Sequence, residues 1–413
     1  MAKKEISINQ LALGMFVIGL DIAWIKSPFL SHSMRMTSQT DIDRLRKSGV
    51  KQITIDTDKG ADVTDGNRVE QIKQVVATEK TDPPQQRPVG NRTPYQEKPT
   101  PMAEELKVAT EIRRQSYAAA EDTNKRIKEN KPLEAKPISP IIAATLKSLT
   151  RNDQAVLSLL RLEKTSEKLL SHLFNVFSLT LALTLRMNVS EEEREALGLA
   201  SFVHDAAWAK LPQNLFGTGK KYTTAEKKLI EKHIDIIASL LSKSDGFSPT
   251  TINIIREHHE LGNGSGYPAG LTADKISLCG NILAVADTYD ELIHGLAGHP
   301  GMLPNNALSY LYQEAQKGLY SVEVVAHLVG IIGVFPLNSA VELSSGERGM
   351  VVENNRNDPL RPKVRVYYSA SGNRFDVPKQ VDLSLNRSGK DELAIQKIID
   401  PRSPAIDPFG LMG

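Results

Sequence analysis

The stretch of sequence that says most about this protein runs from residue 258 to residue 268 and reads His258-His259-Glu260-Leu261-Gly262-Asn263-Gly264-Ser265-Gly266-Tyr267-Pro268. It follows Ile254 and Ile255, which have the spacing of a buried helix face, so the two histidines and the glutamate close a helix. The glycines and the proline after them favour a tight turn. Because a buried imidazole or carboxylate without a partner is costly, we expect these side chains to be paired or to bind metal.

Further polar side chains occupy positions that helical spacing turns inward among apolar residues. They are His172, the pair His204-Asp205, His233 and Asp287. A single histidine on an apolar helix face is more often a hydrogen-bonded core residue than a ligand, and Asp287 alone could be a buried helix-pairing acid. Together with the adjacent histidines of the opening stretch, however, they supply five histidines and two aspartates. That set suits divalent iron, manganese or zinc and is large enough for two ions.

The two adjacent pairs indicate how two ions could share these ligands. Neighbours on a helix diverge by about 100°, so His204 can serve one metal while Asp205 bridges to a second through its two oxygens. For the same reason, one of His258 and His259 should face the second metal directly, while the other reaches it from the side or orients a ligand. Two ions about 3.5 to 4 Å apart can hold a bridging hydroxide and a phosphodiester. We therefore predict that His204 and Asp205 are catalytic.

The fold class predicted for the whole chain is mainly α, in four parts. These are a small α+β domain over residues 1–70, a proline-rich linker and charged helix over 71–137, an all-α domain over 138–335, and a β extension with a tail over 336–413. The first part reads as strands through Ile6, Ile8, Leu11, Met15 and Val17 with a turn at Gly14, a helix from Ser38-Asp41 through Ile42 and Leu45 to Gly49, and a strand over 50–55.

Outside the first domain, the expected elements are mostly helices. Residues 78–101 are proline-rich and extended. The charged segment 103–130 is either a solvated helix that spaces the domains or a partner-binding coil, through which the chain could form a homodimer. Helix starts are predicted at Ser190, Thr223 and Ser248. Near the end, 340–343 and 349–352 read as a hairpin, with 364–368 as a third strand.

Composition narrows the classes of partner and compartment. The net charge of +2 gives no general reason to expect DNA as a partner. Cys279 is the sole cysteine, which excludes an internal disulfide and a zinc finger and fits a reducing, cytoplasmic compartment. The most apolar N-terminal run, residues 11–25, is interrupted by Asp21 and is shorter than the roughly 20 residues that cross a bilayer, so no membrane span is expected.

The opening stretch resembles the HHExxDGxGYP signature of the HD-GYP phosphodiesterases, a branch of the HD superfamily, with His204-Asp205 upstream and Ala286-Asp287 downstream in register. The likeness covers about residues 140 to 340, and residues 333–352 resemble the tail common after that domain. The first 60 or so residues are similar to a domain of unknown function that often precedes it. The resemblance implies a cytoplasmic bacterial signalling enzyme that hydrolyses cyclic di-GMP to linear pGpG or to GMP and so controls motility and biofilm formation.

Carried over by position, the resemblance also implies a ligand set. One metal would be held by His172, His204, Asp205 and Asp287, and the other by Asp205, His233, His258 and His259. The loop residues Gly266, Tyr267 and Pro268, with Asn263, would contact the nucleotide or a partner. Iron or manganese is expected, with zinc an alternative.

The sequence departs from the family pattern at charged positions. The lysine of the HDxGK motif is Trp208, and an electrostatic contact of that kind is worth about 10²- to 10³-fold in rate. Lys210 is the nearest replacement and would also contact substrate, but on a continuing helix it lies about 140° away from Asp205. The aspartate before Gly-Tyr-Pro is Asn263, and arginines of the family are Leu261 and Asn281. Some members bind a third metal through a glutamate one turn before the first histidine, where this chain has Lys168; two metals are therefore expected.

These losses leave a second hypothesis open. It is a catalytically attenuated adaptor with a retained metal site, which binds cyclic di-GMP or a GGDEF-type diguanylate cyclase. Nucleotide hydrolysis of the kind found in other HD enzymes is disfavoured because it leaves Gly266, Tyr267 and Pro268 unexplained. Cys279 is expected to be a small packed side chain rather than a nucleophile.

Overall fold

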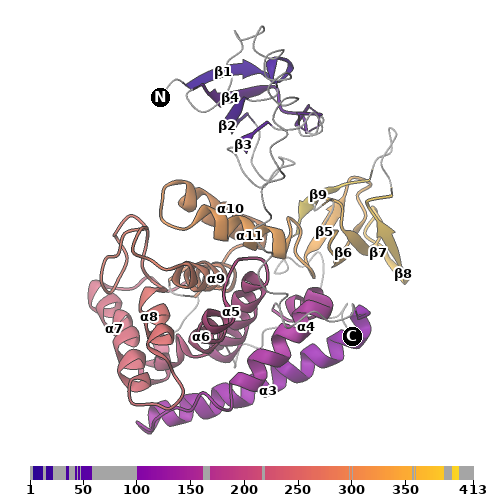
Figure 1. The fold of residues 1–413 in the computed structure, drawn as a ribbon. Coiled ribbons are helices and arrows are strands. Elements are labelled where there is room, and N and C mark those ends of the chain that lie inside the picture. Colours follow the sequence, from indigo (N-terminus) through magenta and orange to yellow (C-terminus); the bar gives the residue numbers. More distant parts are fainter. Residues whose placement is uncertain are drawn as a thin grey trace, which may run out of the picture. The chain divides into compact units, whose positions relative to one another are not determined.

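The structure is a computed structural model that describes residues 3–12, 15–21, 34–36, 42–43, 45–46, 48–57, 100–160, 168–215, 219–296, 298–299, 301–355, 358, 360–385 and 393–399. The chain divides into two compact units, Met1–Pro94 and Tyr95–Gly413 (Figure 1). The turn predicted at Gly14, the helix start predicted at Ser38-Asp41, the body of the proline-rich linker and the C-terminal tail lie outside the described residues.

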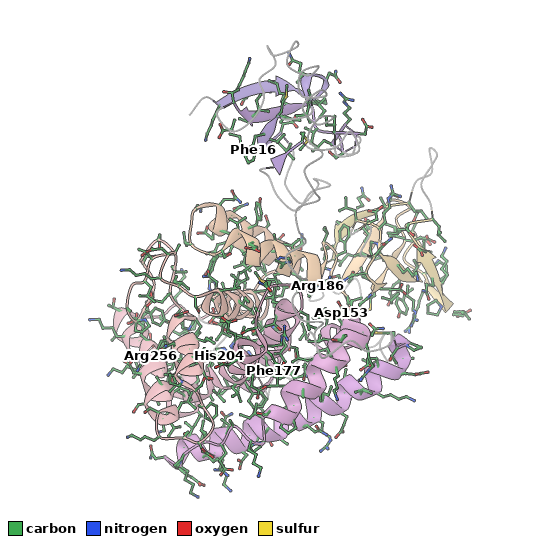
Figure 2. All side chains as sticks on the ribbon, viewed as in Figure 1. Phe16, Asp153, Phe177, Arg186, His204 and Arg256 are labelled. Atoms are coloured by element: carbon green, nitrogen blue, oxygen red, sulfur yellow. The ribbon has the colours of Figure 1, made fainter. Side chains whose placement is uncertain are left out.

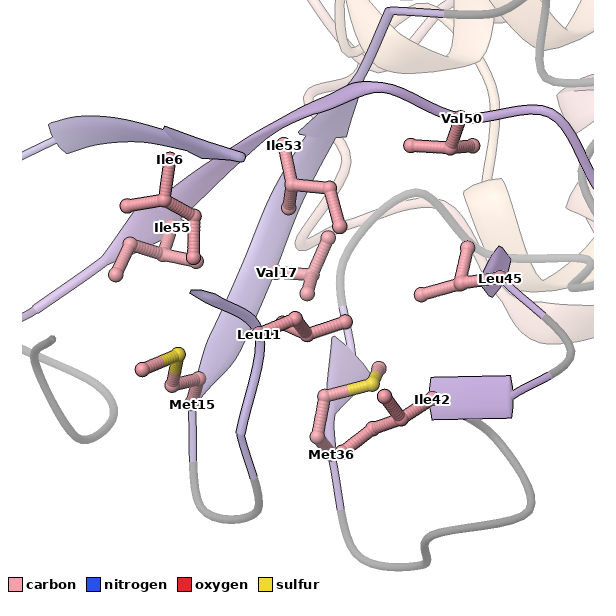
Figure 3. Packing of buried hydrophobic residues seen from close by; sticks show 10 residues of the cluster. All are labelled: Ile6, Leu11, Met15, Val17, Met36, Ile42, Leu45, Val50, Ile53 and Ile55. Atoms are coloured by element: carbon pink, nitrogen blue, oxygen red, sulfur yellow. The ribbon is translucent and has the colours of Figure 1, made fainter. Parts of the chain in front are cut away.

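The first unit is a four-stranded antiparallel sheet of order β1-β4-β2-β3. Its strands are β1 (Lys3–Ser7), β2 (Phe16–Leu20), β3 (Met34–Arg35) and β4 (Gln52–Asp56). Figure 3 shows the core, in which Ile6, Val17 and Ile55 of the strands pack with Ile42 and Leu45 from a short helical segment. The α+β prediction is confirmed here.

One detail of this unit differs from the prediction. Ile8 does not continue the first strand but begins a 3-10 turn, η1 (Ile8–Gln10). The cause is local: the Ser7 hydroxyl accepts from Asn9 N–H, and the Gln10 side chain accepts from Ser7 N–H at 2.9 Å. Such a reciprocal pair of caps starts a helical turn.

The second unit is mainly helical. Its helices are α3 (Met102–Lys128), α4 (Ser139–Ser158), α5 (Lys168–Thr184), α6 (Glu191–Val203), α7 (Thr224–Leu241), α8 (Pro249–Glu257), α9 (Leu278–His294), α10 (Pro304–Gln316) and α11 (Val322–Ile332). The predicted starts are confirmed, because Ser190, Thr223 and Ser248 each cap a helix with the side-chain oxygen. Helix α5, buried from Ser171 to Thr184, lies at the centre against α6 and α9 (Figure 1).

Helix α3 is part of the helical unit, and the interpretation of this segment as a solvated spacer is wrong. One face is buried against α4, α5 and the segment after Asp205; it consists of Glu105, Ala109, Ile112, Ser116, Ala120, Thr123 and Ile127. Arg151 of α4 holds the buried Glu105 carboxylate with two hydrogen bonds of 2.8 Å. Charged residues cover the remaining faces, which explains why composition alone suggested a solvated helix.

The C-terminal part is a five-stranded antiparallel sheet of order β8-β7-β6-β5-β9. The strands are β5 (Ala340–Leu343), β6 (Arg348–Glu353), β7 (Lys363–Tyr368), β8 (Arg374–Asp382) and β9 (Ile395–Ile398). The predicted hairpin and third strand are confirmed, whereas the edge strands β8 and β9 were not predicted. Two hydrogen bonds join the sheet to the end of α4: the Asn338 side chain donates to Ser158 O at 3.0 Å, and Asn354 N–H donates to Gln154 Oε1 at 2.9 Å.

Among the described residues, no helix combines the length and the apolar character needed to cross a membrane.

Candidate metal centre

Helices α5 to α9 bring the polar residues singled out in the sequence together inside the second unit. His172 comes from α5, His204 and Asp205 from the end of α6, His233 from α7, His258 and His259 from the end of α8, and Asp287 from α9. All are buried except His259, whose side chain is 15% exposed. Figure 2 marks His204 among these helices.

The adjacent pairs sit at helix ends rather than within helices. His204 is the C-cap of α6, and Asp205 precedes a 3-10 helix, η4 (Ala206–Lys210). His258 is likewise the C-cap of α8. The two side chains of each adjacent pair therefore point in different directions because the backbone changes direction at the helix end, and not because they are neighbours on a continuing α-helix.

The first group of candidate ligands is His172, His204, Asp205 and Asp287, which offer atoms that all lie within 4.8 Å of one another. His172 Nε2 lies 3.4 Å from Asp205 Oδ2 and 3.2 Å from Asp287 Oδ1. His204 Nε2 lies 3.4 Å from the same Asp287 oxygen. This is a compact, fully buried set of two imidazoles and two carboxylates.

The second group is Asp205, His233, His258 and His259, whose ligand atoms also lie within 4.8 Å of one another. His233 Nε2 and His258 Nε2 lie 3.2 and 3.7 Å from Asp205 Oδ1. The other oxygen of Asp205, Oδ2, is the one that faces His172. Asp205 thus presents one oxygen to each group, as a carboxylate that bridges two metals would.

Backbone carbonyls set the orientation of three of these histidines. Nδ1 of His204 lies 3.0 Å from Ser201 O, Nδ1 of His233 lies 2.7 Å from Ile230 O, and Nδ1 of His258 contacts Ile255 O. A ring whose Nδ1–H donates to a carbonyl keeps a free lone pair on Nε2, and here every Nε2 points into the cluster.

Asp290, which sequence reasoning missed, performs the same task for His172. Its Oδ2 lies 2.8 Å from His172 Nδ1, while its Oδ1 accepts from Asn175 at 2.9 Å and lies 2.9 Å from His294 Nδ1. Asp290 follows Asp287 by three residues on α9, so helical spacing could have indicated that the two carboxylates share a face.

The donor set fits divalent metal ions. Asp205 Oδ1 and Asp287 Oδ2 are buried without a hydrogen-bond partner, and His233 Nε2 faces His258 Nε2 at 3.3 Å. Buried oxygens without donors, and imidazole nitrogens that point at one another, are what a cation of this class would satisfy. Groups of three or four protein ligands also leave positions for water and a phosphate.

Proton affinities differ sharply inside this cluster. Burial alone would lower the pKa of His172, but the surrounding carboxylates of Asp205, Asp287 and Asp290 raise that pKa well above its usual value. Burial dominates at His233 and lowers its pKa to about 4, in spite of Asp205. Burial alone would raise the pKa of Asp205, but the surrounding histidines, His204 foremost, hold that pKa well below the ordinary range.

The loop after α8 is tied to the cluster by Glu260. This buried carboxylate accepts hydrogen bonds from Ala269, Gly270 and Leu271 N–H at 2.6, 3.1 and 2.8 Å. The Tyr267 ring stacks on His259, with ring centroids 4.8 Å apart, ahead of a cis Tyr267–Pro268 bond.

Two of the other loop residues predicted to contact substrate have structural tasks as well. A Cβ atom at Gly266 would collide with the backbone of Glu260 and Leu261, so only glycine allows this close approach. Asn263 is exposed, and its side chain accepts from Ser265 N–H at 3.0 Å within its own turn. Their contacts with substrate stay predictions.

Trp208 and Lys210 are placed differently by η4. Trp208 is 6% exposed, packs with Leu211, Leu215 and Ile230, and lies 6.0 Å from the His233 ring. The Lys210 ammonium donates to Asn130, just beyond α3, and is exposed. The structure therefore puts an apolar indole, and not the nearby ammonium, beside the second group.

Cys279 is packed as predicted. It is buried at the start of α9, and burial raises the pKa of its thiol to about 12. At neutral pH the thiol is protonated and unreactive.

Three family models match consecutive parts of the chain. A domain of unknown function (DUF3391) matches residues 3–138, an HD domain matches residues 136–324, and a KOW domain associated with HD domain matches residues 340–405. The three matches follow one another in this order along the chain.

Among curated proteins, a cyclic di-GMP phosphodiesterase of Pseudomonas aeruginosa is 28% identical over 391 residues, which cover 94% of this chain and 90% of that protein. A cyclic di-GMP phosphodiesterase response regulator of Xanthomonas campestris is 34% identical over 134 residues, 32% of this chain and 35% of that protein. A 3′3′-cGAMP-specific phosphodiesterase of Vibrio cholerae is 30% identical over 105 residues, 25% of this chain and 20% of that protein.

Proposed function

We propose that this chain, in which an HD domain matches residues 136–324, is an HD-GYP protein that hydrolyses cyclic di-GMP at a centre of two divalent metal ions. The observation that carries the proposal is the placement of Asp205 between two groups of buried imidazoles, with one oxygen directed at each. A relative named for this activity aligns with nearly the whole chain, which supports the choice of substrate.

The ligand assignment follows the two groups. His172, His204, Asp205 and Asp287 would hold one ion, and Asp205, His233 and His258, with His259, would hold the other. Metals bound in this way supply a water nucleophile at neutral pH and neutralise charge on the phosphate. In the reaction, the water oxygen bonds to phosphorus and the bond from phosphorus to one ribose oxygen breaks. The leaving ribose oxygen takes up one proton of the water and becomes a hydroxyl, while the other proton passes to the new terminal phosphate or to solvent.

The protein around the ions positions and shields the substrate. The Tyr267 ring, stacked on His259, forms one side of the site and can contact a base of the dinucleotide. Trp208 forms an apolar wall behind His233 and keeps bulk water from that ligand. The carbonyls behind His204, His233 and His258 hold each Nε2 lone pair in position before a metal arrives.

The direct test is hydrolysis by the purified full-length protein, loaded with Mn²⁺ or Fe²⁺. We expect linear pGpG or GMP from cyclic di-GMP, and the double variant His204→Ala, Asp205→Ala is the control. Parallel assays with 3′3′-cGAMP test selectivity, because a relative is named for that dinucleotide. Product no greater than that of the control would refute hydrolysis, and calorimetric binding of cyclic di-GMP without product would favour the adaptor function instead.

We further propose that the activity is attenuated by Trp208. An ammonium at this position, next to His233, would place a positive charge close to the phosphate, whereas the indole contributes none. We expect Trp208→Lys to raise the rate of cyclic di-GMP hydrolysis about 10²-fold. Trp208→Met removes the indole without adding charge and is the matched control. Equal rates for the two variants would contradict attenuation.

The metal is proposed to be iron or manganese, with zinc the alternative, since imidazole and carboxylate ligands suit all three. Elemental analysis of protein purified without added metal identifies the ion. Restoration of hydrolysis by each metal in turn, after chelation, then ranks them.

A further inference from the structure

Glu291 is a buried carboxyl group that the proposed two-metal centre does not use. It lies one turn after Asp287 on α9 and is 7% exposed. Among the described residues its side chain has no hydrogen bond and no ion pair. Since buried carboxyl groups are normally paired or bound to a cation, the isolation of Glu291 needs an explanation.

The surroundings of Glu291 are a third group of candidate ligands. One oxygen of Glu291, one oxygen of Asp287 and one nitrogen of His259 all lie within 4.8 Å of one another. His259 Nδ1 is 3.9 Å from Asp287 Oδ2, an oxygen that is buried without a hydrogen-bond partner. The other oxygen of Asp287, Oδ1, already faces His172 and His204.

We propose that His259, Asp287 and Glu291 form a third position for a divalent cation, next to the two of the proposed centre. Asp287 would then be shared by the first and third positions, as Asp205 would be shared by the first and second. The inference rests on the proposed metal centre but not on its substrate. It departs from the expectation of two metals that Lys168 suggested, because Glu291 supplies a carboxylate from a different helix.

The division of ligands follows from the chemistry of imidazole. A neutral imidazole offers one lone pair while its other nitrogen keeps a proton, so His259 can serve only one ion. His259 would then belong to the third position instead of the second, and the second would keep Asp205, His233 and His258. Each ion then has three or four protein ligands and open positions for water or phosphate oxygens.

Charge favours the same arrangement. The Glu291 and Asp287 carboxylates lie side by side in a buried place, where two negative charges repel each other and a divalent ion relieves the repulsion. A third ion would add a charge of +2, and the Glu291 carboxylate contributes −1. The net charge beside the proposed phosphate position would therefore be more positive by one unit.

The test is metal stoichiometry, which does not depend on turnover. The full-length protein is stripped with a chelator, dialysed against increasing Mn²⁺ and analysed for bound manganese, with electron paramagnetic resonance as a second readout. We expect about three ions per chain in the wild type and about two in Glu291→Gln and Glu291→Ala. Glu323→Gln, an exposed position in the first turn of α11, is the matched control and should bind as the wild type does.

Two bound ions in the wild type would overturn the inference, and so would equal stoichiometry in the wild type and Glu291→Gln. Loss of all ions from Glu291→Gln would overturn it too, because Glu291 would then support the whole centre rather than bind one ion. Two ions with intact hydrolysis refute only the third position. Three ions without hydrolysis refute only the proposed reaction.

Discussion

Single residues of the centre hold protons with very different strength, although all are buried in one cluster. His172 faces three carboxylates, Asp205, Asp287 and Asp290, and keeps its proton to a pH well above its usual pKa. Among the described residues His233 faces only one carboxylate, so the effect of burial prevails and lowers its pKa to about 4. A metal must displace the proton from His172, whereas His233 is already neutral at pH 7. Metal binding should therefore release protons.

This difference predicts how the stability of the metal-free protein depends on pH. The raised pKa of His172 contributes stability that is present below the ordinary histidine pKa of 6.5 and is lost as pH rises through the folded-state value. The lowered pKa of His233 acts on the other side, so that stability is lost as pH falls from 6.5 towards 4. Together these two groups predict that urea unfolding of the metal-free protein shows greatest stability near pH 6.5.

The metal-loaded protein should lack the decline on the alkaline side, because His172 is then a neutral ligand. His172→Asn should also abolish that part of the decline in the metal-free protein. A decline of the same size in this variant would mean that His172 is not its source.

At the scale of elements, helix α3 supports the candidate metal centre through the segments on which it packs. It packs along α4 and α5 and against η4, the 3-10 helix that begins directly after Asp205. The Tyr117 hydroxyl of α3 lies 2.8 Å from Ser171 Oγ, next to His172. Helix α3 therefore contacts the residues directly beside His172 and Asp205, two ligands of the first group.

Packing of α3 can be tested by a pair of substitutions on the same helix. Ile112 is 3% exposed and Val108 is 41% exposed. We expect Ile112→Ala to cost about 2 to 5 kcal/mol of unfolding free energy, the usual range for such a cavity. Val108→Ala should change it by about 0.5 kcal/mol or less, as surface substitutions do. Chemical denaturation measures the unfolding free energy of both variants. Similar small changes in the two would mean that α3 is a solvated spacer after all.

At the scale of the whole molecule, the boundary between the two compact units falls at residue 94, ahead of α3. The sequence instead predicts that α3 belongs to the linker part, over residues 71–137, and that the helical domain begins at residue 138. The buried face of α3, with the buried Glu105 carboxylate held by Arg151, accounts for the difference.

The two boundaries predict different outcomes for truncation. A fragment of residues 95–413 should unfold cooperatively and bind metal with the stoichiometry of the full chain. A fragment of residues 138–413 uncovers the faces of α4, α5 and η4 that α3 covers, and should aggregate or lose metal. Calorimetric unfolding and elemental analysis compare them. Equal stability and metal content of the two fragments would contradict the placement of α3.

Helix positions and the identity of the buried polar residues were open to prediction from sequence because their signals are local. Ser190 with Glu193, and Thr223 with Glu226, form caps within four residues, and the apolar spacing around His172 or Asp287 is visible in a single turn. The hairpin formed by β5 and β6 could likewise be predicted from local signals, because two short apolar runs flank a turn segment. The edge strand β8 was missed because most of its residues are exposed and carry no alternating pattern.

The tertiary structure alone decided the relations between segments distant in the chain. Asp290 meets His172 across 118 residues, and which oxygen of Asp205 faces which histidines depends on where α5, α7 and α8 pack. The position of α3 and the isolation of Glu291 are of the same kind. Periodicity shows that a side chain faces inward, but its partner depends on the packing of helices whose relative positions no local pattern determines.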